Sequence, residues 1–229
     1  MIATGKRCVL VSGGLDSAVA LAEAAREGPV APVFVRSGLV WEPAEMYWLE
    51  RFLQTIGAPA LVVLELPVRD LYGAHWSLTG DDPPDAGSPD EAVYLPGRNL
   101  LLLSKAGVWA VEAGCAAIVM GPLAANPFPD GTRAFFDAMG EAIGRAMGLG
   151  AALPIVTPLA GLTKAEVVRR AAGLPLELTF SCLDPTADHR HCGVCNKCAE
   201  RRKGFAEAGV ADPTDYAYGL RSRTRAGSS

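Results

Sequence analysis

Short apolar runs alternate with longer segments of helical pattern along most of this 229-residue chain. Runs of strand length occur at residues 8–12, 30–35, 60–66, 116–120 and 153–159. Helix-favouring segments occur at 16–26, 44–56, 99–113 and 132–147, and the capping-box spacing of Thr163 and Glu166 starts a further helix over 163–173. Strands that alternate with helices require right-handed crossovers, which cover both faces of a parallel sheet. The sequence therefore predicts an α/β fold, a doubly wound parallel sheet with strands buried on both faces.

The charge balance and the lengths of the apolar runs argue against several classes of partner. The chain carries 21 basic and 25 acidic residues, a formal net charge of −4, so no global basic field favours direct binding of nucleic acid. No apolar run approaches the ~20 residues that cross a bilayer, and the opening residues lack the pattern of a secretory signal. We therefore expect a cytoplasmic protein that uses neither a membrane nor nucleic acid directly.

The first apolar run ends in a short glycine-containing break, Ser12-Gly13-Gly14-Leu15-Asp16-Ser17, before a helical segment begins. Glycines let backbone N–H groups approach phosphate oxygens, and the first turn of a helix adds free N–H groups and the positive end of its dipole. The hydroxyls of Ser12 and Ser17 could donate further hydrogen bonds, and Asp16 could accept Mg²⁺ carried by the phosphates. The break matches neither a Walker loop nor a dinucleotide fingerprint. A tight strand–helix turn with no ligand is the plain alternative.

Four of the six cysteines are clustered near the C-terminal end, with the spacing Cys182-x9-Cys192-x2-Cys195-x2-Cys198. Four thiolates suit a closed, structural Zn²⁺ site with no bound water. An iron–sulfur cluster is the alternative, because C-x2-C-x2-C also opens the ferredoxin pattern. His189 and His191 lie in the same loop and are expected to be exposed or to line a neighbouring cleft.

The break at residues 12–17 resembles the S-G-G-x-D-S loop of the PP-loop ATP pyrophosphatases, which split ATP between its α- and β-phosphates. With the cysteine cluster, the chain is similar to the 7-cyano-7-deazaguanine synthase family. Four further segments carry this likeness, and their order along the chain matches that of the family: "YLPGRNLLLLS", "FPDGTRAFFDAM", "TPLAGLTKAEVV" and "RRKGFAEAGVADPTDYA". The resemblance implies an adenine nucleotide alpha hydrolase-like domain over residues 1–180, a zinc-binding segment and C-terminal helix over 181–220, and a flexible tail over 221–229.

The resemblance also implies a chemistry. A carboxylate on a 7-deazaguanine ring takes AMP from ATP, ammonia displaces the AMP to give an amide, and a second ATP activates the amide so that a nitrile forms. ATP with Mg²⁺, ammonia, the small-molecule carboxylate and a second copy of the chain are the candidate partners. Asp16, Lys164 and Arg98 are the candidate catalytic residues, and the substrate candidates are Asn99, Asp130, Arg133, Glu42 and Glu45.

Some of these residues also have plain structural interpretations. Lys164 could be a solvated helix lysine, and Asp130 with Arg133 could form an ion pair at the start of their helix. The basic run 201–203 is interpreted as a solvated helix face. The segment 80–91, rich in Pro, Gly and Asp, is expected to be a mobile surface loop or a lid.

Two segments depart from the family pattern and leave the substrate open. The family's F-x-Y-G-Q-x-H is replaced by "FVRSGLVWEPAE", and the loop "GPLAANPFPD" has no acid between Gly121 and Asp130, where the family places one that can pair with the N–H edge of guanine. Glu42 or Glu45 could supply the acid from another loop. The alternatives are an enzyme that adenylates a different carboxylate or amide, a PP-loop tRNA thiolase, and a non-catalytic zinc-ribbon module that binds RNA.

Overall fold

Five parallel strands form one sheet in the order β3-β2-β1-β4-β5. The computed structural model describes residues 5–219. The strands are β1 (Arg7–Leu10), β2 (Val30–Arg36), β3 (Val62–Glu65), β4 (Ala117–Val119) and β5 (Ile155–Val156). In register, Cys8 of β1 lies opposite Ala31 of β2 on one side and Ile118 of β4 on the other. The central strand β1 is therefore fully paired, and it leads directly into the glycine-containing break.

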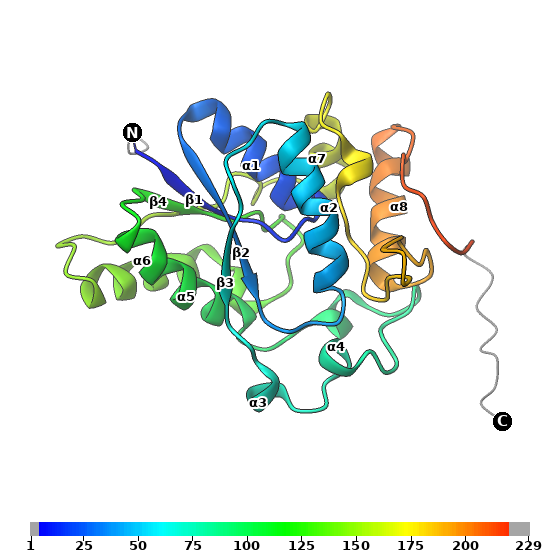
Figure 1. Ribbon diagram of the computed structural model, residues 1–229, viewed down its shortest axis with the longest axis horizontal. Coiled ribbons are helices and arrows are strands. Elements are labelled where there is room, and N and C mark those ends of the chain that lie inside the picture. Colours follow the sequence, from blue (N-terminus) through cyan, green and yellow to red (C-terminus); the bar gives the residue numbers. More distant parts are fainter. Residues whose placement is uncertain (1–4, 220–229) are drawn as a thin grey trace.

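Helices cover both faces of this sheet (Figure 1). On one face, α1 (Leu15–Glu27), α2 (Glu42–Thr55), α7 (Lys164–Arg170) and α8 (Asn196–Ala208) contribute to one hydrophobic core. On the other face, α5 (Arg98–Glu112) and α6 (Arg133–Ala146) close a second core. Two short helices, α3 (Arg69–Tyr72) and α4 (Trp76–Thr79), lie between β3 and α5, and 3-10 turns occur at Asp90–Val93, Pro129–Gly131 and Leu176–Leu178. The predicted doubly wound α/β fold is confirmed.

The predicted strands and helices all form, with differences at their ends. The fifth strand is the most shortened, because only Ile155 and Val156 pair with β4 within the predicted run 153–159. The expectation that every strand is buried on both faces is wrong for β3, where burial alternates and Val63 is 38% exposed. The reason is position: β3 is an edge strand, so it is paired on one side only, with β2. Its helical neighbours leave one face partly open to solvent.

The chain reverses its direction of winding between β1 and β4. From β1 it moves outward through β2 to β3, and it then returns to the other side of β1 to form β4 and β5. In open α/β sheets, ligands bind at such a switch point, beyond the carboxyl ends of the strands. Residues 12–17 lie at this edge because they directly follow β1. The topology therefore places the candidate phosphate loop where this class of fold binds its ligands.

The segment with the four cysteines packs against the chain that follows β2. A third hydrophobic cluster joins Leu39 and Trp41 to Phe180, Leu183 and the four cysteines. The boundary predicted at residue 180 stays a prediction, and the tail predicted over 221–229 lies outside the described residues. No helix within residues 5–219 is long and apolar enough to cross a membrane.

Candidate functional site

The glycine-containing break turns sharply between β1 and α1. Gly13 has a φ of +76°, and a Cβ there would lie 3.0 Å from the carbonyl oxygen of Glu45, so a larger residue would be strained and crowded. The N-cap of α1 is Gly14, which has no side chain to cap the N–H groups of the first helical turn. The backbone of residues 13–17 can therefore accept an anion at the positive end of the α1 dipole.

The two serines of the break form hydrogen bonds within the turn that stabilise it. The Ser17 hydroxyl donates to the carbonyl oxygen of Gly14 at 2.9 Å, and its oxygen accepts the backbone N–H of Ser12 at 3.2 Å. Ser17 is buried, whereas Ser12 is partly exposed. The hydroxyl of Ser17 is thus already engaged in the loop itself, and the binding of phosphate by either serine stays a prediction.

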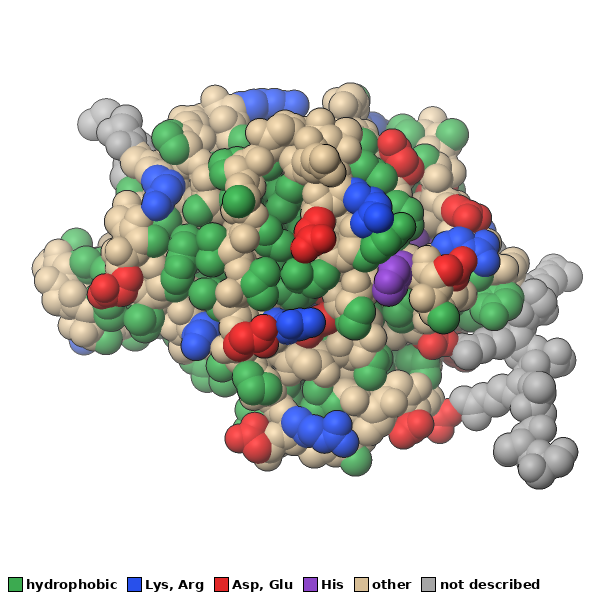
Figure 2. All heavy atoms as spheres, viewed as in Figure 1, with side chains coloured by type: hydrophobic (Ala, Val, Ile, Leu, Met, Phe, Trp, Pro, Cys, Tyr) green, Lys and Arg blue, Asp and Glu red, His purple; other side chains and the backbone are tan. Residues whose placement is uncertain are grey.

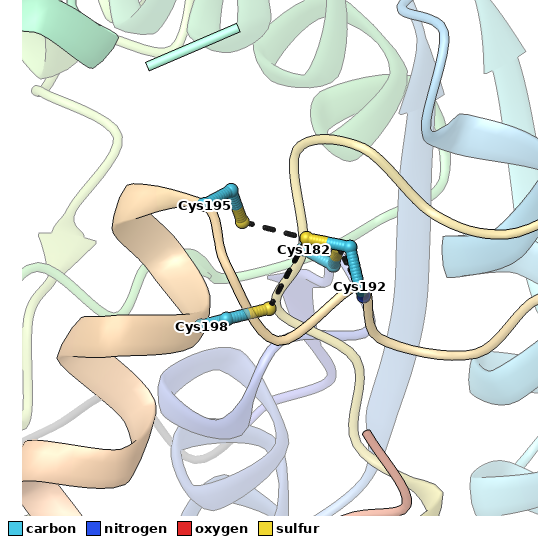
Figure 3. A group of neighbouring side chains, drawn as sticks. All are labelled: Cys182, Cys192, Cys195 and Cys198. Carbon is cyan, nitrogen blue, oxygen red and sulfur yellow. Dashed lines mark hydrogen bonds between the residues drawn. The ribbon is translucent and has the colours of Figure 1, made fainter. Parts of the chain in front are cut away.

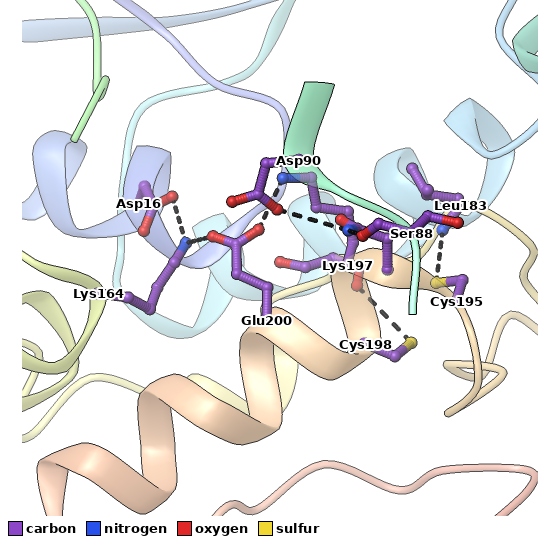
Figure 4. A network of polar contacts seen from close by, with 11 residues as sticks. Asp16, Ser88, Asp90, Lys164, Leu183, Cys195, Lys197, Cys198 and Glu200 are labelled. Atoms are coloured by element: carbon purple, nitrogen blue, oxygen red, sulfur yellow. Dashed lines mark hydrogen bonds and ion pairs between the residues drawn. The ribbon is translucent and has the colours of Figure 1, made fainter. Parts of the chain in front are cut away.

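Charged side chains from three distant segments meet beside this loop in a row of alternating sign (Figure 4). The Lys164 ammonium lies 2.6 Å from Oδ2 of Asp16 and 3.0 Å from Oε1 of Glu200. Oε2 of Glu200 in turn lies 2.7 Å from the ammonium of Lys197. The interpretation of Lys164 as a solvated helix lysine is wrong, because its side chain is only 19% exposed and is paired on two sides. The capping box of Thr163 and Glu166 is confirmed at the start of α7.

Electrostatics keep Lys164 and Glu200 of this row charged. Burial alone would lower the pKa of Lys164, but the carboxylates of Asp16 and Glu200 outweigh it and the pKa is raised. Burial alone would raise the pKa of Glu200, but the ammonium groups of Lys164 and Lys197 lower it to about 2. The other oxygen of Asp16, Oδ1, is buried and has no hydrogen-bond partner among the described residues. An ammonium and a free carboxylate oxygen therefore stand together at the N-terminus of α1.

The segments around Asn99 and Asp130 are joined by hydrogen bonds at the start of α5. The backbone N–H of Asn99 donates to Oδ2 of Asp130 at 2.9 Å, and the Asn99 side-chain amide donates to the Asp130 carbonyl at 3.0 Å. The interpretation of Asp130 and Arg133 as an ion pair is wrong. Arg133 instead pairs with Asp137 at 2.8 Å, because residues four apart share a face of α6. It also donates a hydrogen bond to the carbonyl oxygen of Ile155.

Arg98, at the first position of α5, lies near enough to the two acids of α2 for its positive charge to act on their pKa values. Its Nε is buried and has no hydrogen-bond partner within the part of the chain that the structure describes. Burial and the neighbouring carboxylate of Glu42 together raise the pKa of Glu45 to about 8, although the positive charge of Arg98 and a hydrogen bond with Trp41 act against this. Arg98 and Glu45 thus interact through their charges, although no ion pair within 4.0 Å joins them among the described residues.

Glu42 has a structural task that sequence reasoning missed. Its carboxylate accepts the backbone N–H of Ser37 at 2.7 Å and that of Gly38 at 2.9 Å, which secures the turn after β2. The side chain is buried, and burial raises its pKa while these backbone donors lower it. Of the two acids proposed for the substrate, Glu45 is the one that accepts neither of these backbone N–H groups.

The four clustered cysteines converge on one point (Figure 3). Their sulfur atoms all lie within 4.8 Å of one another and are buried, and the pairs Cys182–Cys195 and Cys192–Cys198 are each 3.9 Å apart. This is too far for a disulfide bond of about 2 Å. It matches the roughly 3.8 Å between thiolates around a tetrahedral Zn²⁺ with bonds of about 2.3 Å.

Backbone N–H groups point at these sulfur atoms, as thiolates require. The N–H groups of residues 183, 192, 193 and 194 donate to the sulfurs of the four cysteines at 3.3–3.4 Å. Such donors stabilise the negative charge of metal-bound thiolates in the shell outside the metal. The four cysteines therefore fit a metal ion in their donor type, their spacing and their outer hydrogen bonds.

The loop at residues 80–91 is anchored to the cysteine segment. The backbone N–H of Ala86 donates to the carbonyl of Val194 at 2.9 Å. The Asn196 backbone N–H donates to the carbonyl of Pro84 at 3.0 Å, and its side-chain amide donates to the carbonyl of Ser88 at 2.8 Å. Sequence reasoning missed Asn196, because nothing in its local pattern relates it to a loop more than a hundred residues away. Whether the loop acts as a lid stays a prediction.

Two expectations of exposure are wrong in the C-terminal segment. His191 is buried against the ring of Phe180, its Nε2 accepts the backbone N–H of Ser181 at 3.0 Å, and burial together with Arg201 lowers its pKa to about 3. Arg201 is also buried, where it donates to the hydroxyls of Thr179 and Thr214. Both side chains close the core beneath the cysteine segment, whereas His189 is partly exposed, as expected.

The family model and the curated relatives that match this sequence agree on one family. The family model described as queuosine biosynthesis protein QueC matches residues 6–209. The 7-cyano-7-deazaguanine synthase of Paramagnetospirillum magneticum is 38% identical over 225 residues, which cover 91% of this chain and 97% of that protein. The enzyme of the same name from Geotalea uraniireducens is 36% identical over 225 residues, which cover 93% and 98%.

A solved structure supports the fold alone. The predicted subunit of a tRNA methyltransferase from Methanocaldococcus jannaschii aligns with a TM-score of 0.51 and 14% identity, over 95% of this chain and 94% of that one. At this identity the likeness concerns the course of the backbone and not the ligands or the reaction.

Proposed function

The chain belongs to the QueC family of queuosine biosynthesis proteins, and on this premise we propose how its site makes 7-cyano-7-deazaguanine from 7-carboxy-7-deazaguanine, ATP and ammonia. The substrate carboxylate attacks the α-phosphate of ATP, so an acyl-adenylate forms and pyrophosphate leaves. Ammonia then displaces AMP to give the amide. The amide oxygen attacks a second ATP, releasing pyrophosphate, and loss of AMP with a proton leaves the nitrile.

One observation carries this proposal: Asp16 and Lys164 meet at the N-terminus of α1, at the carboxyl edge of the sheet. Residues 12–17 would hold the departing pyrophosphate with backbone N–H groups, and the Lys164 ammonium would neutralise its charge. Oδ1 of Asp16, buried and unpartnered within residues 5–219, is the free oxygen that would hold Mg²⁺ carried by the phosphates. No nucleophilic side chain is required, because the site positions two reactants and neutralises phosphate charge.

Arg98 and Glu45 are the residues that we assign to the substrate carboxylate and its ring. Arg98 has a buried Nε without a partner among the described residues, and a guanidinium is suited to bind a carboxylate with two parallel hydrogen bonds. Glu45 would accept hydrogen bonds from the N–H edge of the ring, in place of the acid that is missing between Gly121 and Asp130. Asn99, Asp130 and Arg133 would shape the site indirectly, since their polar groups bond to protein atoms.

Zn²⁺ is the metal that we propose for the four cysteines. The closed set of four thiolates leaves no position for a reactive water, so the ion would act structurally. We expect the isolated protein to be colourless and to carry one zinc ion per chain. A brown protein with absorbance near 400 nm (roughly the usual band of an iron–sulfur cluster) would show that the four cysteines hold an iron–sulfur cluster and not zinc. Buried free thiols fit a reducing compartment, and we therefore place the enzyme in the cytoplasm.

The direct test supplies 7-carboxy-7-deazaguanine, ammonium chloride and Mg-ATP, and follows the nucleotide products and the ring compound by chromatography. We expect two AMP and two pyrophosphate for each nitrile formed. Formation of ADP and phosphate would reject the proposed cleavage of ATP. A panel of other heteroaromatic carboxylates runs in parallel, because the altered segments at 35–45 and 121–130 favour a second candidate, the adenylation of a different acid.

The other two alternatives have less support. The relatives that match more than nine-tenths of the chain are synthases, which does not favour a tRNA thiolase or an RNA-binding zinc ribbon. Among the described residues on the face drawn in Figure 2, acidic and basic side chains are interspersed and do not gather into a large basic patch. RNA-binding proteins usually carry such a patch.

A further inference from the structure

Glu200 lies outside both the glycine-containing break and the segment with Arg98, yet it contacts Lys164 directly. We propose that Glu200 is a positioning residue, which holds the Lys164 ammonium in place when Asp16 turns from Lys164 to the cation on the phosphates of ATP. This role rests on the proposed function, because it assumes that ATP phosphates occupy the site. It adds a residue from α8, the helix that begins at the cysteine cluster, to the nucleotide site.

The geometry provides Lys164 with two carboxylates that differ in their other contacts. Asp16 belongs to the loop that would receive the phosphates, and its short bond of 2.6 Å to Lys164 is lost if its carboxylate binds a cation. Glu200 lies 3.0 Å from the same ammonium, and its second oxygen is held by Lys197 at 2.7 Å. Glu200 is therefore fixed from both sides, and it can retain Lys164 after Asp16 has turned away.

The helix that carries Glu200 also makes room for the stem of Lys164. At Gly204, one turn after Glu200, a Cβ would lie 2.4 Å from Cγ of Lys164 and 3.4 Å from its Cβ. Glycine inside a helix is unfavourable by roughly 0.5–1 kcal/mol relative to alanine, so its presence here calls for a reason. The close crossing of α7 and α8 over the Lys164 stem provides one. The contact with Glu200 and the space at Gly204 are separate observations, and both concern Lys164.

A purely structural interpretation of Glu200 makes a different prediction. If the carboxylate only joined α7 to α8, its loss would lower the stability of the fold. Nucleotide binding would then weaken no more than in other variants that are destabilised to the same extent. If it positions Lys164, its loss acts on nucleotide affinity through Lys164 alone. A double-mutant cycle separates the two, because a residue that works through Lys164 has no effect once Lys164 is gone.

The experiment measures the binding of Mg²⁺ and α,β-methylene-ATP, which cannot be cleaved at the bond of interest, by calorimetry on the full metal-loaded chain. Glu200→Gln is expected to weaken binding about tenfold, the effect of losing one charge-assisted contact that is partly solvent-screened. Lys164→Ala is expected to weaken it more, and the double variant should bind as Lys164→Ala does. Glu200→Asp should recover part of the affinity. Additive losses in the double variant would overturn the proposal.

Two further variants keep the test decisive. Glu207→Gln, on the same helix and paired with exposed Lys203, should bind the analogue like the wild type. If Glu200→Gln does not fold, Gly204→Ala displaces the Lys164 stem without removing a charge, and it should weaken binding several-fold only when Lys164 is present. Equal weakening in the Lys164→Ala background would overturn the proposal, as would a wild-type chain that does not bind the analogue. A wild type that binds the analogue but forms no AMP would refute the proposed function and leave the role of Glu200 intact.

Discussion

Replacement of Asp16 by asparagine is expected to reduce kcat/KM for AMP formation by about 100- to 1,000-fold, the usual consequence of removing one charged group that stabilises the transition state. Asparagine has nearly the same shape, so the turn at residues 12–17 should persist. The substitution removes the charge that pairs with Lys164 at 2.6 Å, and it replaces the buried Oδ1 by an oxygen or nitrogen without charge. The variant should therefore bind the cation more weakly at residue 16, and it should hold the Lys164 ammonium less firmly. Initial rates of AMP and pyrophosphate release measure the effect.

The control for Asp16→Asn is Glu141→Gln, which removes an exposed carboxylate paired with Arg145 on α6, in the helix layer on the other face of the sheet. This variant should retain the wild-type rate, because an exposed ion pair contributes about 0–1 kcal/mol to stability and lies away from the loop. The melting temperature and metal content of Asp16→Asn should stay close to those of the wild type, since Lys164 keeps Glu200 as a partner. A rate for Asp16→Asn within a few-fold of the wild type would remove Asp16 from the proposed catalytic residues.

Much of the fold follows from the periodicity of the sequence, because buried parallel strands are apolar runs and the helices between them have their own period. The differences arise where tertiary position matters. At β3 the edge position leaves Val63 exposed although its run is as apolar as that of a central strand. The conformation of α7 was predictable from Thr163 and Glu166, since the capping box is a local signal. Local signals thus predict elements, while burial depends on neighbours far away in the chain.

The candidate site divides in the same way. The glycine-containing break and the cysteine spacing are compact motifs, and the structure brings the four sulfurs together as predicted. Glu200 and Asn196 carry no such motif, because their distant partners lie in α7 and in the loop at 80–91. The only signal for Glu200 is its spacing of three residues from Lys197, which is common on exposed helices. The burial of His191 and Arg201 likewise depends on tertiary packing around α8, which the local sequence does not indicate.

Cys195→Ser is expected to release the metal and to lower the melting temperature by roughly 10 °C, equivalent to about 3 kcal/mol for a chain of this size. A serine hydroxyl is a poor substitute for a thiolate, and the remaining three sulfurs would keep their buried positions without a full set of ligands. Metal analysis together with thermal unfolding measures both effects. Cys115→Ala is the matched control, because Cys115 is a buried cysteine outside the cluster and its loss should leave the metal bound.

Because of the position of Cys195, the Cys195→Ser substitution should affect more than the metal site. Cys195 is the N-cap of α8, Cys198 lies in its first turn, and Asn196 between them secures the loop at 80–91. Glu200 follows within the next turn and holds Lys164. Release of the metal should therefore loosen the start of α8 and weaken the binding of Mg²⁺ and α,β-methylene-ATP at the same time. A Cys195→Ser variant that keeps one metal per chain and its melting temperature would show that Cys195 is not a required ligand. A variant that loses the metal but binds the analogue with unchanged affinity would show that the cluster and the nucleotide site are independent.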